Sequence, residues 1–191
     1  MHKVYVPGPH RFSKAEYHQM HDLGFFTDQY VELIDGEIVD MPVPGNRHCI
    51  STDVVAEQLR KVFGPNHWVR MQMPLNLSAK SEPMPDVAAV VGAARTHTET
   101  PTAALLVVEV SETTLADDRG RKASLYPSAG IVDYWIVNLV DTQLEVHSNP
   151  VADASAPFGF RYAEVKVLRS SDHASPLARP AAQILVSELL P

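Results

Sequence analysis

The sequence predicts a mixed α and β fold in which helices flank a central mixed β-sheet. Apolar segments alternate between helical and strand-like spacing, and 15 prolines and 9 glycines separate them. A length of 191 residues suits one well-buried domain and is short for two, so we expect a single domain over 1–191. The hydrophobic share of 45% and the charged share of 20% exclude a disordered chain, a coiled coil and a collagen-like fibre.

The net charge, the lack of long apolar runs and the single cysteine argue against several classes of protein. The net charge is −7, from 16 Lys and Arg against 23 Asp and Glu, which argues against general coating of nucleic acid through phosphate contacts. No apolar run approaches the ~20 residues that span a bilayer, and the start of the chain lacks the apolar core of a signal peptide. Cys49 has no partner for an internal disulfide, so we expect a cytoplasmic protein in which this side chain is buried.

The first half of the chain predicts two helices and a hairpin. Ser13 and Glu16 have the spacing of a capping box, which opens a helix. Asp35-Gly36 lies between two apolar runs and is a strong signal of a two-residue hairpin turn. A later segment has apolar side chains at helical intervals and ends at Gly64-Pro65-Asn66. In chain order, the expected elements are a helix over 13–24, strands over 30–34 and 37–41, and a helix over about 50–63.

The second half predicts most of the sheet. One segment is almost continuously apolar, which is typical of a central strand covered on both faces. Gly120 and Pro127 interrupt an otherwise helical segment. In chain order, the expected elements are strands over 68–77, 86–91 and 104–110, a helix over about 116–129, strands over 131–137 and 143–147, a loop over 149–159, a strand over 161–168, and a strand or short helix over 181–190.

Glu109 is the most informative residue for function, because it interrupts the apolar run over 105–110. Burial of an unpaired carboxylate is costly, so such a group is normally neutralised, paired or bound to a metal. The structural alternative is a glutamate at the end of the strand that faces solvent or pairs with Arg119 or Arg121.

Asp86 and Lys122 indicate a functional site only when they are considered together with Glu109. Asp86 follows Pro85 at the start of a strand, where neighbouring strands could bring it beside Glu109. Two such carboxylates on one side of a sheet form a hard oxygen site suited to Mg²⁺ or Mn²⁺. Lys122, on the next predicted helix, could stabilise charge that develops on a phosphate. The alternatives are an ordinary Pro-Asp turn and a solvated surface lysine.

Several dispersed motifs occur in a fixed order between about 30 and 147. They are Glu-Leu-Ile-Asp-Gly-Glu at 32–37, His48, Pro85-Asp86, Val108-Glu109-Val110-Ser111, Lys122, Tyr126, Ala129-Gly130 and Tyr134-Trp135-Ile136-Val137. As an ordered set they resemble the Uma2-type endonucleases (DUF820) of the PD-(D/E)XK nuclease superfamily. The resemblance implies a restriction-endonuclease-like core and metal-dependent hydrolysis of phosphodiester bonds in nucleic acid, with DNA favoured over RNA.

The resemblance also implies roles for single residues. Asp86 matches the aspartate of the superfamily pattern and Glu109 its acidic partner, so both are expected to be catalytic and to bind Mg²⁺ or Mn²⁺. The superfamily's lysine would fall at Ser111, and Lys122 occupies the place to which the lysine has moved in Uma2-like sequences. His48 matches the family's histidine and is expected to orient the attacking water. A lone histidine is otherwise more often a cap or a packing residue.

Glu37 is the third expected metal ligand. A two-residue turn at Asp35-Gly36 puts Glu32 and Glu37 on one face of the hairpin, so one of them could reach the site. The alternative is a pair of glutamates that face solvent.

We therefore expect a single-domain endonuclease that depends on Mg²⁺ or Mn²⁺. The basic residues Arg119, Arg121 and Lys122 would attract the phosphate chain despite the acidic total. The alternative is a catalytically silent nuclease fold used as a binding or regulatory module, which Ser111 and the charge of −7 favour. A third reading is a structural protein with Glu109 in an ion pair. We expect no membrane partner, and an exposed sheet edge favours a homodimer.

Overall fold

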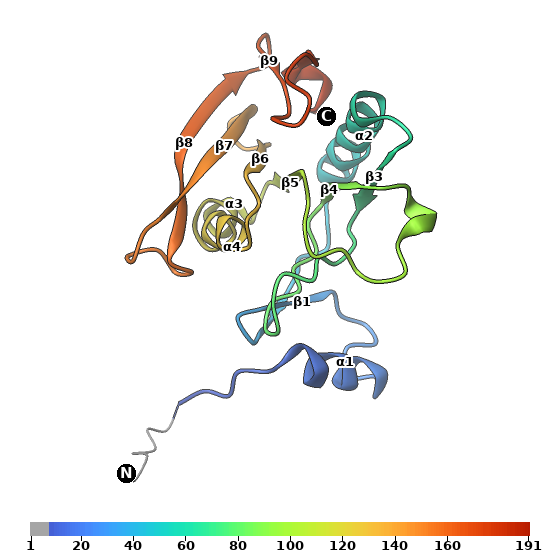
Figure 1. Ribbon diagram of the computed structural model, residues 1–191, viewed down its shortest axis with the longest axis vertical. Helices are drawn as coiled ribbons and strands as arrows, with labels where there is room; N and C mark the ends of the chain where they lie inside the picture. Colours follow the sequence, from blue (N-terminus) through green and yellow to red (C-terminus); the bar gives the residue numbers. More distant parts are fainter. Residues whose placement is uncertain (1–7) are drawn as a thin grey trace. The chain divides into compact units, whose positions relative to one another are not determined.

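The computed structural model describes residues 8–191, which fall into two compact units (Figure 1). The first unit holds residues 8–43 and 76–83, and the second holds residues 44–75 and 84–191. Each unit has its own cluster of buried apolar side chains. That the chain forms one domain over 1–191 stays a prediction.

The first unit begins with helix α1, Lys14–Asp22. The predicted capping box is confirmed, because the Ser13 side chain accepts from the backbone N–H of Glu16 while the Glu16 side chain accepts from the N–H of Ser13. Tyr17 faces inward from this helix, and its hydroxyl donates to the carbonyl of Val31 at 2.9 Å. The local sequence thus fixes both the start of α1 and the face that it buries.

The predicted hairpin is also present in the first unit. Strands β1, Val31–Ile34, and β2, Glu37–Asp40, pair antiparallel around Asp35 and Gly36. Both turn residues have positive φ, 49° and 73°, as the tight turn between twisted strands requires.

The second unit is built on a six-stranded mixed sheet in the order β3-β4-β5-β6-β7-β8. Its strands are β3 His67–Met71, β4 Val87–Val91, β5 Leu106–Ser111, β6 Asp133–Asn138, β7 Gln143–Ala152 and β8 Phe160–Arg169. Strands β5 and β6 run parallel, and the other neighbours in this sheet run antiparallel. The predicted mixed sheet with flanking helices is confirmed.

Helix α2, Asn46–Phe63, covers one face of this sheet (Figure 1). Alternate residues of β5 join Leu59 in the apolar core on that face, including Val108 and Val110. Because side chains alternate along a strand, Glu109 and Ser111 point to the opposite face. The continuous helical segment over 115–128 lies on that face and contacts β7 and β8.

This helical segment contains a π-turn. It comprises α3 Leu115–Asp117, the π-turn Asp118–Lys122 and α4 Ala123–Ser128. Such wide turns inside α-helices often occur at functional sites. The helix expected over 116–129 is therefore confirmed, with a π-turn that the sequence did not predict.

Several boundaries differ from the sequence-based expectation. Helix α2 begins at Asn46 rather than near residue 50, so His48 lies in its first turn instead of just before it. Strand β3 ends at Met71, before Pro74. Strand β7 continues to Ala152, so the expected loop over 149–159 is wrong for its first four residues.

Other differences concern the C-terminal region and the cysteine. The expected strand or helix over 181–190 is both, a short strand β10 Ile184–Leu185 followed by a 3₁₀ turn, Val186–Glu188. Strand β10 pairs with β9, His173–Ala174, which the sequence did not suggest. A further 3₁₀ turn spans Ala94–Thr96. Cys49 is exposed rather than buried. Within residues 8–191, every helix is too short or too polar to span a lipid bilayer.

Candidate active site

Asp86 and Glu109 lie side by side at the junction of β4 and β5. Val87 pairs with Val108, so the residue before β4 stands opposite Glu109. The backbone N–H of Asp86 donates to Glu109 Oε2 at 3.3 Å, and the N–H of Val110 donates to Asp86 Oδ2 at 2.8 Å. Both carboxylates are buried. The structure thus brings together the two acids that the sequence singled out.

Glu109 is held by two side chains from the helical segment. Lys122 Nζ donates to Glu109 Oε1 at 3.0 Å, and the Tyr126 hydroxyl donates to the same oxygen at 2.5 Å. Lys122 and Tyr126 are four positions apart, one helical turn, so both project toward Glu109. The solvated surface lysine considered above is excluded, because Lys122 is buried.

His48 contacts the other carboxylate. From the first turn of α2, its Nε2 hydrogen-bonds Asp86 Oδ2 at 3.1 Å, and its Nδ1 lies 3.4 Å from the hydroxyl of Thr52. The hydrogen bond with Asp86 raises the pKa of His48 above its ordinary value, against the opposing effect of burial. This raised pKa favours an imidazolium that neutralises Asp86.

Asp118 is a third buried acid, which sequence reasoning did not select. Its Oδ2 accepts from the hydroxyls of Ser111 at 2.6 Å and Thr114 at 2.7 Å, and its Oδ1 lies 3.7 Å from Lys122 Nζ. No hydrogen bond reaches Oδ1 within the described residues. Burial raises the pKa of Asp118, although Lys122 and the two hydroxyls oppose the rise.

The expected basic cluster is divided between two places. The Arg119 side chain points away from Glu109 and donates two hydrogen bonds to Glu145, Nε to Oε2 at 2.9 Å and Nη2 to Oε1 at 2.5 Å. Lys122 is buried against Glu109. Arg119 and Lys122 therefore contact different carboxylates, and attraction of a phosphate chain by Arg119, Arg121 and Lys122 stays a prediction.

Glu37 belongs to the hairpin of the first unit. It is exposed, and its Oε1 lies 2.7 Å from Arg11 Nη1. Its pairing with Ile34 puts it on the same face of the hairpin as Glu32, as expected. Its role as a metal ligand stays a prediction.

The carboxylates of Asp86 and Glu109 suit a hard divalent cation that takes only part of its ligands from the protein. Within residues 8–191, no group of three or more His, Cys, Asp and Glu side chains is placed to hold a metal. Mg²⁺ is commonly bound by one or two carboxylates, with waters and substrate phosphates completing its shell. In the described part of the chain no hydrogen bond reaches Asp86 Oδ1, which leaves this oxygen for a cation. The two carboxylates therefore fit a magnesium-type site that substrate completes.

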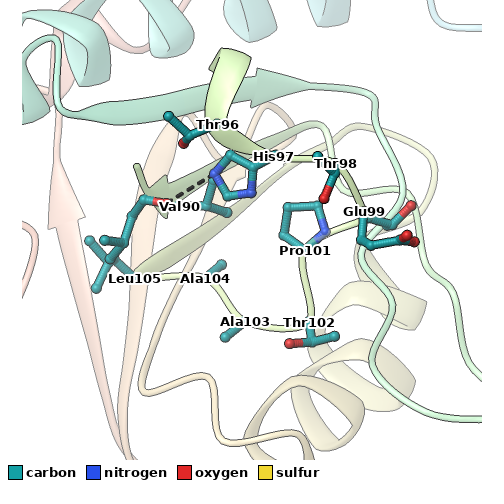
Figure 2. A pocket seen from close by; sticks show the side chains of 12 residues that line it. Val90, Thr96, His97, Thr98, Glu99, Pro101, Thr102, Ala103, Ala104 and Leu105 are labelled. Carbon is teal, nitrogen blue, oxygen red and sulfur yellow. Dashed lines mark hydrogen bonds between the residues drawn. The ribbon is translucent and has the colours of Figure 1, made fainter. Parts of the chain in front are cut away.

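A separate cavity of about 490 Å³ lies against the connection between β4 and β5 (Figure 2). Threonine side chains and backbone of this connection line it, and His97 Nε2 hydrogen-bonds the carbonyl of Val91 at 3.0 Å beside it. Asp86 and Glu109 do not line it. The cavity is distinct from the acidic site.

Comparison with known proteins assigns the chain to a family. The Uma2 model, described as "Putative restriction endonuclease", matches residues 15–186. The chain belongs to the Uma2 family. The fold agrees with this assignment, because a crystal structure titled as a "putative nuclease belonging to DUF820" from Anabaena variabilis ATCC 29413 is similar to it with a TM-score of 0.70. The two chains are 13% identical, and the similarity covers 93% of this chain and 97% of the other. No curated protein matches the sequence.

Within this Uma2 chain, sequence reasoning missed the roles of three residues at the site. Tyr126 belongs to the ordered set of motifs but had no assigned role; it is buried, and its hydroxyl donates to Glu109. Asp118 carried a usable signal, since it precedes Lys122 by four positions and so shares a helix face with it. Sequence reasoning gave Ser111 no positive role, whereas its hydroxyl donates to Asp118 and orients it.

Proposed function

We propose that this Uma2 protein is an endonuclease that depends on Mg²⁺ or Mn²⁺ and hydrolyses phosphodiester bonds of nucleic acid, with DNA as the preferred substrate. The observation that carries the proposal is the junction of Asp86 and Glu109, with Lys122 Nζ 3.0 Å from Glu109. Hard oxygen donors can hold a metal ion, and an adjacent ammonium can stabilise the negative charge that develops during phosphodiester hydrolysis. A cytoplasmic location and a homodimer stay predictions.

Asp86 and Glu109 would hold the divalent cation. When bound, such a cation supplies Lewis acidity toward a phosphate oxygen and acidifies water. The protein's own groups then position the reactants. The Tyr126 hydroxyl fixes the Glu109 carboxylate, and Lys122 supplies the positive charge that stabilises a phosphate as negative charge develops on it.

The second acid has its own supporting group. His48 holds Asp86 Oδ2 and leaves Oδ1 of that carboxylate for the cation. We further propose that His48 orients the attacking water. Ser111 and Asp118 act behind Lys122 as positioning residues, because Ser111 fixes Asp118 and Asp118 flanks the ammonium.

Nicking of supercoiled plasmid tests the proposal. Purified protein is incubated with Mg²⁺ or Mn²⁺, beside reactions with EDTA, and a single-stranded RNA is offered in parallel. We expect metal-dependent nicking that Asp86→Asn abolishes and that Asp53→Asn, at an exposed aspartate of α2, leaves unchanged. Nicking that survives Asp86→Asn would contradict the assignment.

The competing function is a nuclease fold that binds nucleic acid without cleaving it. One observation favours it, namely that Ser111 stands where the superfamily pattern has its lysine. Under this function the protein retains Mn²⁺ binding, which Asp86→Asn weakens, but cleaves neither DNA nor RNA in any metal. The nicking assay separates the two functions, and calorimetric titration with Mn²⁺ beside it shows whether a protein that does not cleave still binds the metal.

A further inference from the structure

Strand β8 is an open edge of the six-stranded sheet. It is ten residues long and pairs with β7 on one side only (Figure 1). Residues 163–167 are all exposed, which includes both faces of the strand. Within the described residues, their backbone groups make no bonds except those to β7. Half of the backbone groups over this stretch therefore point outward without a partner.

The edge carries exposed apolar side chains as well. Val165 is 51% exposed and Val167 is 50% exposed, and they lie on one face of the strand. The opposite edge, β3, is only five residues long. A long exposed edge with half-exposed valines is a typical surface for pairing with another strand.

The sequence of this edge is complementary to itself. If two copies pair antiparallel about Val165, Glu164 of each copy stands opposite Lys166 of the other. The two charge pairs lie on one face of the joined strands. On the other face, Val165 meets Val165, and Ala163 meets Val167. Opposite charges and apolar pairs directly across a ladder stabilise it.

Neighbouring registers lose this complementarity. A pairing centred on Glu164 brings two glutamates opposite each other, and one centred on Lys166 brings two lysines together, which destabilises the ladder. A shift by a single residue places Glu164 opposite a valine. The Val165-centred register is therefore the one that the charges select.

We propose that two copies of the chain form a two-fold symmetric dimer through antiparallel pairing of residues 163–167 of β8, centred on Val165. The two six-stranded sheets then form one continuous sheet. Each copy contributes the same surface, as a two-fold interface requires. Because the shared ladder is short, the dimer dissociates on dilution.

Charge reversal tests the register. Sedimentation velocity of the full chain over a wide range of concentration is expected to show a shift from monomer to dimer. Glu164→Lys and Lys166→Glu each place like charges opposite each other and should raise the dimer Kd by about tenfold or more. The double variant E164K/K166E restores both pairs and should restore the dimer. A wild-type chain that stays monomeric, or single variants that dimerise as well as wild type, would overturn the proposal.

A cross-link tests the two-fold axis independently. In a Cys49→Ser background, Val165→Cys places two thiols opposite each other, at the separation of Cα atoms that a disulfide spans. Mild oxidation should give a covalent dimer for this variant. Val140→Cys, at an exposed valine between β6 and β7, is the matched control and should give no covalent dimer. Equal cross-linking of the two variants, or none for Val165→Cys, contradicts the axis. Unchanged circular dichroism and melting temperature confirm that the variants fold.

Discussion

Glu109 and Glu145 occupy equivalent places in the sheet. They lie in one row on the same face, with Ile136 of β6 between them. Both are 3% exposed, and each contacts a cation from the same π-turn, Lys122 for Glu109 and Arg119 for Glu145. Position and burial are therefore alike, and only the surroundings can give the two carboxylates different roles.

The surroundings of Glu145 are those of a structural ion pair. Arg119 donates to both of its oxygens, and Asn138 and Gln143 donate to Oε1 as well. Burial alone would raise the pKa of Glu145, but these hydrogen bonds and the charge of Arg119 outweigh it and hold the pKa below its ordinary value. Both oxygens of the Glu145 carboxylate thus accept hydrogen bonds from neighbouring side chains.

The surroundings of Glu109 contain further acids. Asp86 adjoins it through a backbone hydrogen bond, and Asp118 lies beyond Lys122 with its Oδ1 buried and without a hydrogen bond within residues 8–191. Burial raises the pKa of Asp118. A buried carboxylate oxygen without a hydrogen bond distinguishes this cluster of acids from the Glu145 ion pair, in which both carboxylate oxygens accept hydrogen bonds.

The largest contrast is expected when each glutamate is neutralised. Glu109→Gln, like Asp86→Asn, should lower metal-dependent cleavage by about 10³-fold or more, because a cation ligand is lost. Glu145→Gln should leave cleavage within about threefold of wild type and lower the free energy of unfolding by about 1–3 kcal/mol, because Arg119 loses its charged partner. Plasmid nicking and urea denaturation measure the two effects. Equal loss of cleavage in both variants would remove the distinction.

The two cations give the next largest contrast. Lys122→Met should reduce kcat by about 10²-fold, since the positive charge beside the reacting phosphate is lost. Arg119→Met should leave kcat unchanged and reduce stability by about 1 kcal/mol, because the Arg119 side chain is 44% exposed and solvent screens its charge. Single-turnover cleavage and thermal melting are the measurements. A drop in kcat for Arg119→Met as large as that for Lys122→Met would show that the two pairs act together.

Much of this arrangement could be predicted from sequence, for identifiable reasons. Glu109 was recognised because a charge in an apolar strand is conspicuous, and Asp86 because the Pro-Asp pair precedes a strand. The hairpin at Asp35-Gly36 and the capping box at Ser13 are local signals, and both proved correct.

What could not be predicted depends on three-dimensional neighbours. Glu145 lies between Leu144 and Val146 in β7, a pattern in which the polar residue is usually exposed. The local sequence therefore does not indicate that Glu145 is buried. The π-turn decides that Arg119 and Lys122 diverge, and helical periodicity does not reveal such a turn. Strand β7 continues through Pro150 although Asn149 has a φ of 61°, whereas the sequence suggested a loop there.

A smaller effect is expected at the aspartates that flank the two cations. Asp118 Oδ1 lies 3.7 Å from Lys122, and Asp141 Oδ2 lies 3.6 Å from Arg119. Asp118→Asn should lower kcat by about tenfold with KM unchanged, because the ammonium is less firmly positioned. Ser111→Ala should act in the same direction, since it frees Asp118. Asp141→Asn should leave kcat unchanged. Steady-state kinetics on a fluorescent oligonucleotide provides the values, and an Asp118→Asn effect on KM alone would exclude the positioning role.

The smallest contrast concerns the histidine beside each carboxylate, His48 by Asp86 and His147 by Glu145. The hydrogen bond with Asp86 raises the pKa of His48, whereas burial lowers the pKa of His147. A raised histidine pKa stabilises the fold below the unfolded value of about 6.5, and this contribution is lost as the pH rises through the folded pKa. A lowered pKa acts in the opposite sense, because below about pH 6.5 the unfolded state binds a proton that the folded state does not bind.

Urea denaturation in EDTA should therefore show His48→Gln most destabilised relative to wild type at acid pH, with the difference narrowing as the pH rises. His147→Gln should lose less stability than wild type on acidification, so its relative stability improves as the pH falls. Parallel pH profiles for the two variants would mean that the two histidines do not differ in protonation, and the contrast between the two carboxylates would then rest on Asp86 and Asp118 alone.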